Sequence, residues 1–181
     1  MEEKYITVFS REMWEYIANI FGQTLPALER SLKGLTQDDL NWQPQPDCNS
    51  IGWIVWHLTR VQDGIMAGIK GEEQLWIEDK WYAKFNRAAD PMDSGGGHTA
   101  EDVAAFQSPD VETLLAYHRS VLERSRKYIT DLSFADLNRQ FNEPRFKTPP
   151  TVGQMLMIVI SDGLQHVGQV DYIRGLLKAK G

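Results

Sequence analysis

Four long segments of the chain carry apolar residues at intervals of three and four positions, the spacing of helices that pack on one side. These segments cover residues 10–32, 50–70, 110–129 and 151–177. Helices of this length bury their apolar stripes most simply against one another. The spacing therefore predicts an all-α fold, and we expect a four-helix bundle.

A long stretch without helical periodicity separates the second helix from the third. It runs over residues 72–109, and a connection of this length inside a compact domain usually covers something. We expect this crossover to lie over one end of the bundle. Its aromatic half should pack on the helices through Trp76, Trp81, Tyr82 and Phe85. Residues 94–97, Ser-Gly-Gly-Gly, have no side chain large enough to anchor them, so we expect a mobile gate there.

Two short segments of the chain are similar to each other. Residues 35–43, LTQDDLNWQ, resemble residues 132–140, LSFADLNRQ, and each segment stands between two long helices. The similarity favours two related helical hairpins joined by the crossover, which would give the bundle a pseudo-twofold axis. The alternative is that both segments are common helix-capping phrases.

Composition limits the classes of function. The chain of 181 residues fits one domain, residues 1–181, and its formal net charge is -6. An acidic surface without a clustered Lys/Arg stripe argues against a nucleic-acid partner. The longest apolar run, residues 155–160, is far shorter than the roughly 20 residues of a membrane-spanning helix. Because Cys48 is the only cysteine and no signal peptide is evident, we expect a cytoplasmic protein that does not bind membranes.

Three polar residues on the inward faces of the second and fourth helices are candidates for a metal site. Asp162 and His166 lie four residues apart, so both project from one face of their helix, about 5–6 Å from each other. His57 lies one turn from Ile54 and Val61 in the apolar stripe of the second helix. Two imidazoles and a carboxylate leave coordination positions open and suit Zn, Ni, Fe or Mn. The alternative is a buried histidine that is hydrogen-bonded to Asp162.

Two segments carry a resemblance to a known family. Residues 49–58, NSIGWIVWHL, and residues 161–169, SDGLQHVGQ, resemble the DinB/YfiT superfamily, and the similarity spans nearly the whole chain. The resemblance implies a four-helix bundle in which three histidines hold a divalent metal. His57 and His166 match two of them, whereas Asp162 stands where the third histidine is common. A thiol-dependent transferase branch tolerates such an aspartate, which implies a two-histidine, one-carboxylate centre; the alternatives are weaker binding or a lost metal.

Other residues are candidates for the surroundings of this site. Gln169, one turn after the last of these histidines, and Asp63 are candidate acceptors for the free N–H of a metal-bound imidazole. Trp56 is a candidate pocket residue, although an aromatic residue at helical spacing is core by default. His98 follows three glycines and is either a base that swings over the site or part of a solvated loop. For His118, a packing role in the core is favoured over a role as a ligand.

From the residues and the resemblance together we expect a divalent-metal-dependent enzyme that acts on a small molecule. An open coordination position lowers the pKa of a bound water or thiol and so creates a nucleophile. The resemblance implies a transferase that uses a low-molecular-weight thiol, or a hydrolase, and we expect a homodimer. The alternative is a non-catalytic, stress-associated binding protein with a vestigial metal site.

Overall fold

The structure, a computed structural model, describes residues 2–142 and 146–180. The described residues are mostly helical and contain no strand, so the all-α prediction is confirmed. In chain order the helices are α1 (Glu2–Phe21), α2 (Thr24–Leu32), α3 (Gln37–Asn41), α4 (Ile51–Lys70), α5 (Leu75–Glu78), α6 (Trp81–Lys84), α7 (Ala100–Ala105), α8 (Val111–Thr130), the 3-10 helix η1 (Asp136–Asn138) and α9 (Val152–Lys180). None of these helices combines the length and the apolar character needed to cross a membrane.

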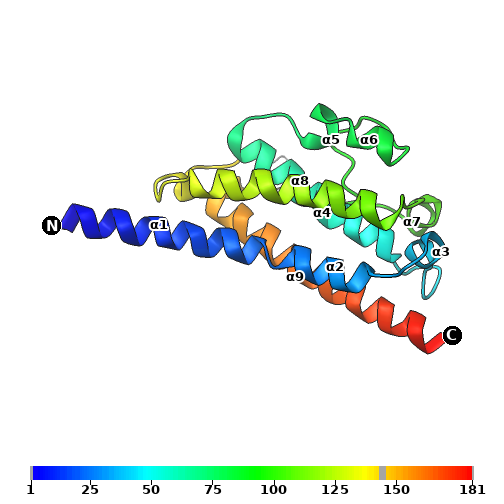
Figure 1. Ribbon diagram of the computed structural model, residues 1–181. Coiled ribbons are helices and arrows are strands. Elements are labelled where there is room, and N and C mark those ends of the chain that lie inside the picture. Colours follow the sequence, from blue (N-terminus) through cyan, green and yellow to red (C-terminus); the bar gives the residue numbers. More distant parts are fainter. Residues whose placement is uncertain (1, 143–145, 181) are drawn as a thin grey trace.

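Four long helical segments lie side by side and enclose the core (Figure 1). They are α4, α8, α9 and the pair formed by α1 and α2. Helix α4 packs against both α8 and α9, while α1 and α2 pack against α8, and α2 also contacts α9. Each long segment therefore has two neighbours, and the facing sides of α4 and α9 are in direct contact.

The helix predicted over residues 10–32 is instead two helices, and α1 begins earlier than predicted. The helix is broken at Gly22 and Gln23, which form a turn between α1 and α2. Pro26 explains the break, because it has no N–H to donate to the Gly22 carbonyl and its ring would clash with that carbonyl in a continuous helix. At the break, Thr24 Oγ1 donates a hydrogen bond to the Phe21 carbonyl at 3.1 Å.

Side-chain caps fix where α4 and α9 begin. Ser50 Oγ accepts a hydrogen bond from the backbone N–H of Trp53 at 3.3 Å, so that Ser50 is the residue that caps α4. Gly71, at φ +72, ends α4 as predicted. Thr151 and Gln154 form the predicted capping box before α9, with hydrogen bonds of 2.8 and 3.2 Å. These caps set which faces of the two helices meet.

The two similar segments adopt similar local structures. Thr36 and Asp39 form a capping box at the start of α3, and Ser133 and Asp136 make the same three hydrogen bonds before η1. A shared cap is expected both from an internal duplication and from a common capping phrase. The local structure therefore accounts for the similarity under either explanation.

The aromatic half of the crossover packs on the bundle, as predicted, but along its side and not over an end (Figure 1). Trp76, Trp81 and Phe85 are buried, and their rings lie 5.7, 5.2 and 5.7 Å from the ring of Tyr117 on α8. Tyr82 is partly buried. This half runs along the side because it is tied to the middle of α4 by contacts described below, whereas α7, later in the crossover, lies at the end of the molecule beside α3 (Figure 1).

Candidate metal centre

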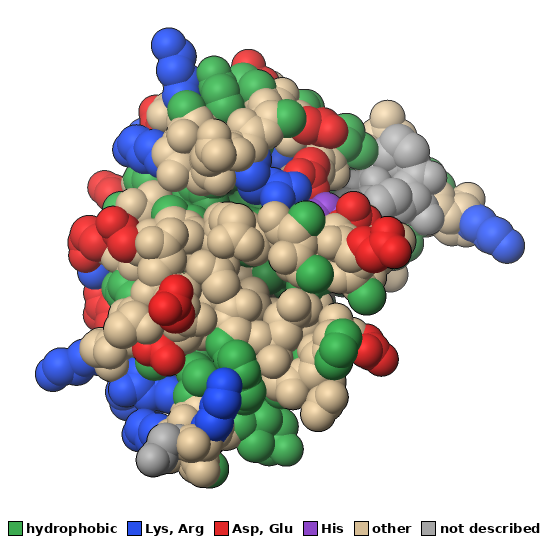
Figure 2. Space-filling view, turned by 90° about the vertical axis from the view of Figure 1, so that its right-hand side faces the viewer, with side chains coloured by type: hydrophobic (Ala, Val, Ile, Leu, Met, Phe, Trp, Pro, Cys, Tyr) green, Lys and Arg blue, Asp and Glu red, His purple; other side chains and the backbone are tan. Residues whose placement is uncertain are grey.

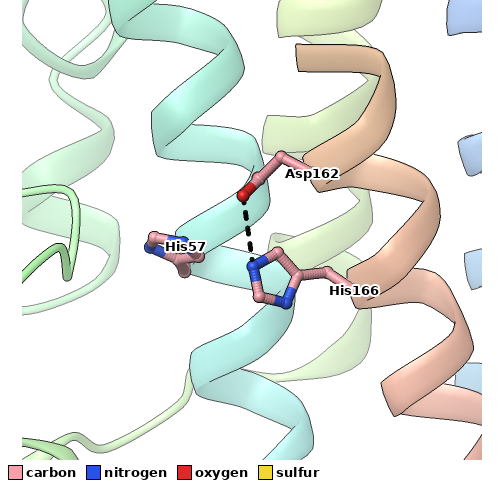
Figure 3. Close-up of side chains that lie close together, drawn as sticks. All are labelled: His57, Asp162 and His166. Carbon is pink, nitrogen blue, oxygen red and sulfur yellow. Dashed lines mark ion pairs between the residues drawn. The ribbon is translucent and has the colours of Figure 1, made fainter. Parts of the chain in front are cut away.

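His57 of α4 and the pair Asp162 and His166 of α9 point toward one another between the two helices (Figure 3). One ligand atom from each residue lies within 4.8 Å of the ligand atoms of the other two. The two imidazole rings meet edge to face with centroids 4.9 Å apart. His166 Nε2 lies 3.4 Å from Asp162 Oδ1. All three residues are partly buried, so the group is sheltered but reachable from solvent.

The imidazole of His57 is oriented by the crossover and by its own helix. Its Nδ1 donates a hydrogen bond to the backbone carbonyl of Ser94. The ring of Trp53, one turn earlier on α4, stacks on the imidazole with centroids 4.8 Å apart and planes 10° from parallel. Because the Ser94 carbonyl can only accept, the proton lies on Nδ1 and Nε2 keeps its lone pair. His57 is therefore held in the tautomer that can bind a metal through Nε2.

The imidazole of His166 is oriented by a residue of the same helix. Its Nδ1 lies 2.8 Å from Oε1 of Gln169 and donates to it. Its Nε2 faces Asp162 and is the nitrogen left to bind a metal. Metal-bound imidazoles in proteins usually donate their other N–H to an oxygen acceptor of this kind, which fixes the ring. Gln169 thus accepts the hydrogen bond from His166 Nδ1 that its predicted role requires.

The sequence profile of the DinB superfamily matches residues 20–170. The chain belongs to the DinB superfamily. A crystal structure of a conserved protein from Enterococcus faecalis has the same fold, with a TM-score of 0.82 and 22% sequence identity over 91% of this chain and 96% of that chain. None of the curated proteins matches the chain. Fold and family are thus established by the comparisons, while the chemistry rests on the site.

The two imidazoles of this DinB-superfamily protein differ in their affinity for protons. Burial lowers the pKa of His57 and outweighs the Ser94 carbonyl and the charge of Asp162, which both raise it. Burial also acts to lower the pKa of His166, but the hydrogen bonds with Asp162 and Gln169 outweigh it, so that this pKa is raised. A metal ion would therefore meet a neutral His57, and it would compete with a proton at His166 near neutral pH.

Ser94 and Gly95 at the start of the glycine tract are anchored, so the prediction that nothing holds residues 94–97 was wrong for these two residues, whereas Gly96 and Gly97 are exposed. Gly95 is buried at φ +86, and a Cβ atom there would lie 2.7 Å from Trp53, 2.9 Å from Trp56 and 3.1 Å from Nδ1 of His57. Its backbone N–H donates to Oδ1 of Asp93 at 3.3 Å. The prediction considered only side chains, whereas backbone groups and close packing hold the tract against α4.

His98 supports the glycine tract and has neither of the two roles predicted for it. Trp53 Nε1 donates to Nδ1 of His98 at 3.1 Å, and Nε2 of His98 donates to Oδ1 of Asp93 at 3.0 Å. Both ring nitrogens are thus occupied by protein atoms. His98 is a structural link between α4 and the crossover, because a swinging base or a solvated loop residue would need those nitrogens free.

Arg60 is the structural residue that the sequence reasoning missed. It lies on α4, one turn after His57, and is 1% exposed. Its guanidinium donates to the backbone carbonyls of Asp90, Pro91 and Asp93, at 3.2, 3.1 and 3.1 Å. Burying an arginine is costly unless its donors are satisfied, and here crossover carbonyls satisfy them. The available signal was an arginine placed within an apolar helical stripe.

Asp63 does not lie beside the candidate metal ligands, which corrects its predicted role. Its buried carboxylate accepts hydrogen bonds of 2.8 to 3.0 Å from the backbone N–H groups of Leu75 and Trp76, from Tyr117 Oη and from Arg124. Asp63 follows His57 by six residues, which turns its side chain about 240° around the helix axis. It therefore ties α5 to α4 on another face.

Trp56 and His118 are core residues. Trp56 is fully buried, with its ring 6.3 Å from that of Trp76 and 5.2 Å from that of Phe106, so the pocket role predicted for it is not the one it has. His118 is also fully buried, and its ring nitrogens lie 2.9 and 3.0 Å from the hydroxyls of Thr24 and Thr59. Burial lowers the pKa of His118 to about 4. His118 is thus the packing residue that was favoured.

Proposed function

We propose that this protein is a divalent-metal-dependent enzyme in which His57, Asp162 and His166 bind the metal. The convergence of the three ligand atoms within 4.8 Å of one another carries this proposal. Each imidazole also donates from Nδ1 to a protein oxygen, so both Nε2 atoms are available together. A set of two nitrogens and one carboxylate oxygen fits Zn, Ni, Fe or Mn, and three protein ligands leave room for a further group.

The proposed reaction is transfer involving a low-molecular-weight thiol, or hydrolysis, with a small molecule as substrate. With a divalent ion held by these three residues, the pKa of a bound thiol or water would be lowered, which would make either group a nucleophile near neutral pH. The chain contributes positioning. The Ser94 carbonyl and Gln169 hold the two imidazoles, and Asp162 supplies a negative charge. Membership of the DinB superfamily supports this assignment, which was expected from the resemblance in sequence.

Metal content tests the proposal. Protein purified without chelators should carry close to one equivalent of a divalent metal when it is measured by inductively coupled plasma mass spectrometry. His57→Ala and His166→Ala should each abolish tight binding, while helical circular dichroism persists because buried apolar residues supply the core. His98→Ala, which removes a neighbouring imidazole outside the ligand set but loosens the crossover, should still bind metal with only a lowered affinity.

Two results would contradict the proposal. Stoichiometric metal in His57→Ala or in His166→Ala would remove that residue from the ligand set. A wild-type protein that stays metal-free when zinc, nickel, iron and manganese are offered would instead favour the non-catalytic alternative. In that case the Asp162–His166 ion pair, at 3.4 Å, would be what remains of the site.

A further inference from the structure

A cavity of about 460 Å³ lies beside the proposed metal centre. It is formed by the loop before α4, the start of α4 and the C-terminal half of α9. Its lining consists of Pro44, Cys48, Asn49, Ile54, Gln165, Gly168, Gln169, Tyr172, Ile173 and Leu176. Gln169 belongs both to this lining and to the site, because its Oε1 accepts the hydrogen bond from Nδ1 of His166. The cavity is therefore one side chain away from the candidate ligands.

We propose that this cavity binds the substrate of the metal centre and that the substrate is a small, uncharged molecule with an apolar body and a hydrogen-bonding group. That the ligand is a substrate rests on the proposed function. The chemical class of the ligand rests on the cavity itself. A volume of about 460 Å³ falls within the roughly 300–1,000 Å³ of small-molecule sites, which suits a molecule of metabolite size.

The absence of charge in the lining carries the choice of ligand class. None of the residues that line this cavity is Asp, Glu, Lys, Arg or His. A second cavity has the same volume of about 460 Å³ but a charged lining that includes Lys70, Glu72, Asp79 and Arg124. A charged ligand would lose hydration in the first cavity without gaining an ion pair there, whereas an apolar ligand loses nothing. Figure 2 shows the end of the molecule at which α3, α7 and the C-terminus lie, where apolar side chains lie between charged ones.

The polar and apolar groups of the lining are arranged for such a ligand. Ile54 and Ile173 are buried and form an apolar floor, while the Tyr172 ring is 70% exposed at the rim. An apolar ligand would cover that ring and bury its surface. Because Oε1 of Gln169 is used by His166, the amide N–H₂ group of Gln169 is the donor that remains for a ligand. The residue that orients His166 would thus also contact the bound molecule.

Two glycines of α9 provide a matched pair of variants. A Cβ atom at Gly168 or at Gly175 would meet no atom within 4 Å, so a side chain can begin at either position without a clash at its first carbon. Gly168 lines the proposed cavity, whereas Gly175 lines a different cavity together with Arg30 and Lys178. Gly168→Leu therefore fills the proposed cavity, and Gly175→Leu makes the same change of residue elsewhere on the same helix.

The test uses N-phenyl-1-naphthylamine, an uncharged fluorescent probe. Gly168→Leu should weaken its binding by about tenfold or more, because leucine takes the volume that the probe would fill, and Gly175→Leu should leave binding unchanged. Saturating probe should slow alkylation of Cys48, which lines the cavity and is the only cysteine of the chain. The anionic probe 8-anilinonaphthalene-1-sulfonate should bind at least about tenfold more weakly to the wild type.

Each outcome decides one part of the proposal. The cavity is not the binding site if Gly168→Leu and the wild type bind the uncharged probe equally well. The same conclusion follows if bound probe does not protect Cys48 from alkylation. Equal binding of the anionic probe at this site would overturn the uncharged class of ligand. Metal content, measured on the same samples, separates this inference from the proposed function. A metal-free protein with the expected probe pattern would overturn the metal enzyme and keep the cavity as a binding site.

Discussion

The two helices that form the candidate site hold their histidines by different means. On α9, Asp162, His166 and Gln169 all come from one helix, and helical spacing alone brings them together. On α4, His57 is oriented by the Ser94 carbonyl, which lies 37 residues further along the chain. The α9 side is therefore built locally, whereas the α4 side depends on the packing of the whole crossover.

On the α4 side, further residues hold the crossover in place without contacting the imidazole nitrogens that would bind the metal. The guanidinium of Arg60 holds three backbone carbonyls of the crossover. Asp93 accepts hydrogen bonds from Gly95, His98 and Arg87, at 3.3, 3.0 and 2.7 Å. These contacts place Ser94 beside His57. A substitution that displaces the crossover should therefore lower metal affinity by changing the orientation of His57. A comparable substitution on α9 should lower metal affinity only where it changes a residue next to the ligands.

Among substitutions that leave the three candidate ligands in place, the largest effect is expected from Gly95→Ala. Its new Cβ atom would lie 2.7 Å from Trp53 and 2.9 Å from Trp56, both buried, and alanine is strained at φ +86. Overpacking and strain together should lower the free energy of unfolding by roughly 2–4 kcal/mol. Because Ser94 would be displaced from His57, metal affinity should fall by about a hundredfold or more. Urea unfolding and titration against a chromophoric chelator measure the two quantities.

Gly97→Ala is the control for that change. Gly97 has the same φ of +86, but a Cβ atom there would meet nothing within 4 Å. It should therefore lose only about 1–2 kcal/mol from backbone strain and keep the wild-type metal affinity. If the two alanine variants bind metal equally well, the Ser94 carbonyl does not orient His57 for metal binding.

The same difference explains which parts of the site could be predicted from the sequence. Asp162, His166 and Gln169 were found by helical spacing and by the family resemblance, since both describe residues close together in the sequence. His57 was found because it lies in an apolar stripe. The face of the helix on which each of these residues lies follows from helical spacing alone, and the structure brings the residues close together.

Errors arose where a backbone group or a residue distant in the sequence decides the structure. The anchoring of the glycine tract depends on the Ser94 carbonyl and on the space beneath Gly95, neither of which has a side-chain signal. Asp63 was misplaced because its partners are backbone N–H groups of the crossover. The break between Phe21 and Thr24 differs from these, because Pro26 signals it in the sequence although the apolar periodicity continues across it.

A smaller effect is expected from Gln169→Leu on the α9 side. Leucine is similar in size but accepts no hydrogen bond from Nδ1 of His166, so the ring loses its orientation. Metal affinity should fall by about tenfold, the lower end of the range for such outer contacts, because Asp162 still contacts the ring. Gln169→Glu keeps an acceptor at this position and should retain the wild-type affinity. Equal losses in both variants would show that the acceptor is not what matters at Gln169.

The pH dependence of metal affinity needs no substitution and compares the two sides in one unmodified protein. The pKa of His166 is raised above 6.5 and that of His57 is lowered below 6.5. A proton must leave each imidazole before the metal binds, so affinity falls as the pH drops below each pKa in turn. The fall should be about tenfold per pH unit below the pKa of His166, and about a hundredfold per unit only below that of His57.

The sign of the two shifts sets the order of these steps. A raised pKa means that His166 holds its proton at a higher pH, so the α9 side is the first to lose its ligand as the solution becomes acidic. Gln169→Leu removes one of the hydrogen bonds that raise this pKa, so the first bend in the plot of log affinity against pH should move to lower pH, while the second stays in place. A wild-type plot that falls by about a hundredfold per unit from its first bend would mean that the two histidines titrate together. In that case the locally built side and the crossover-dependent side would not differ in their affinity for protons.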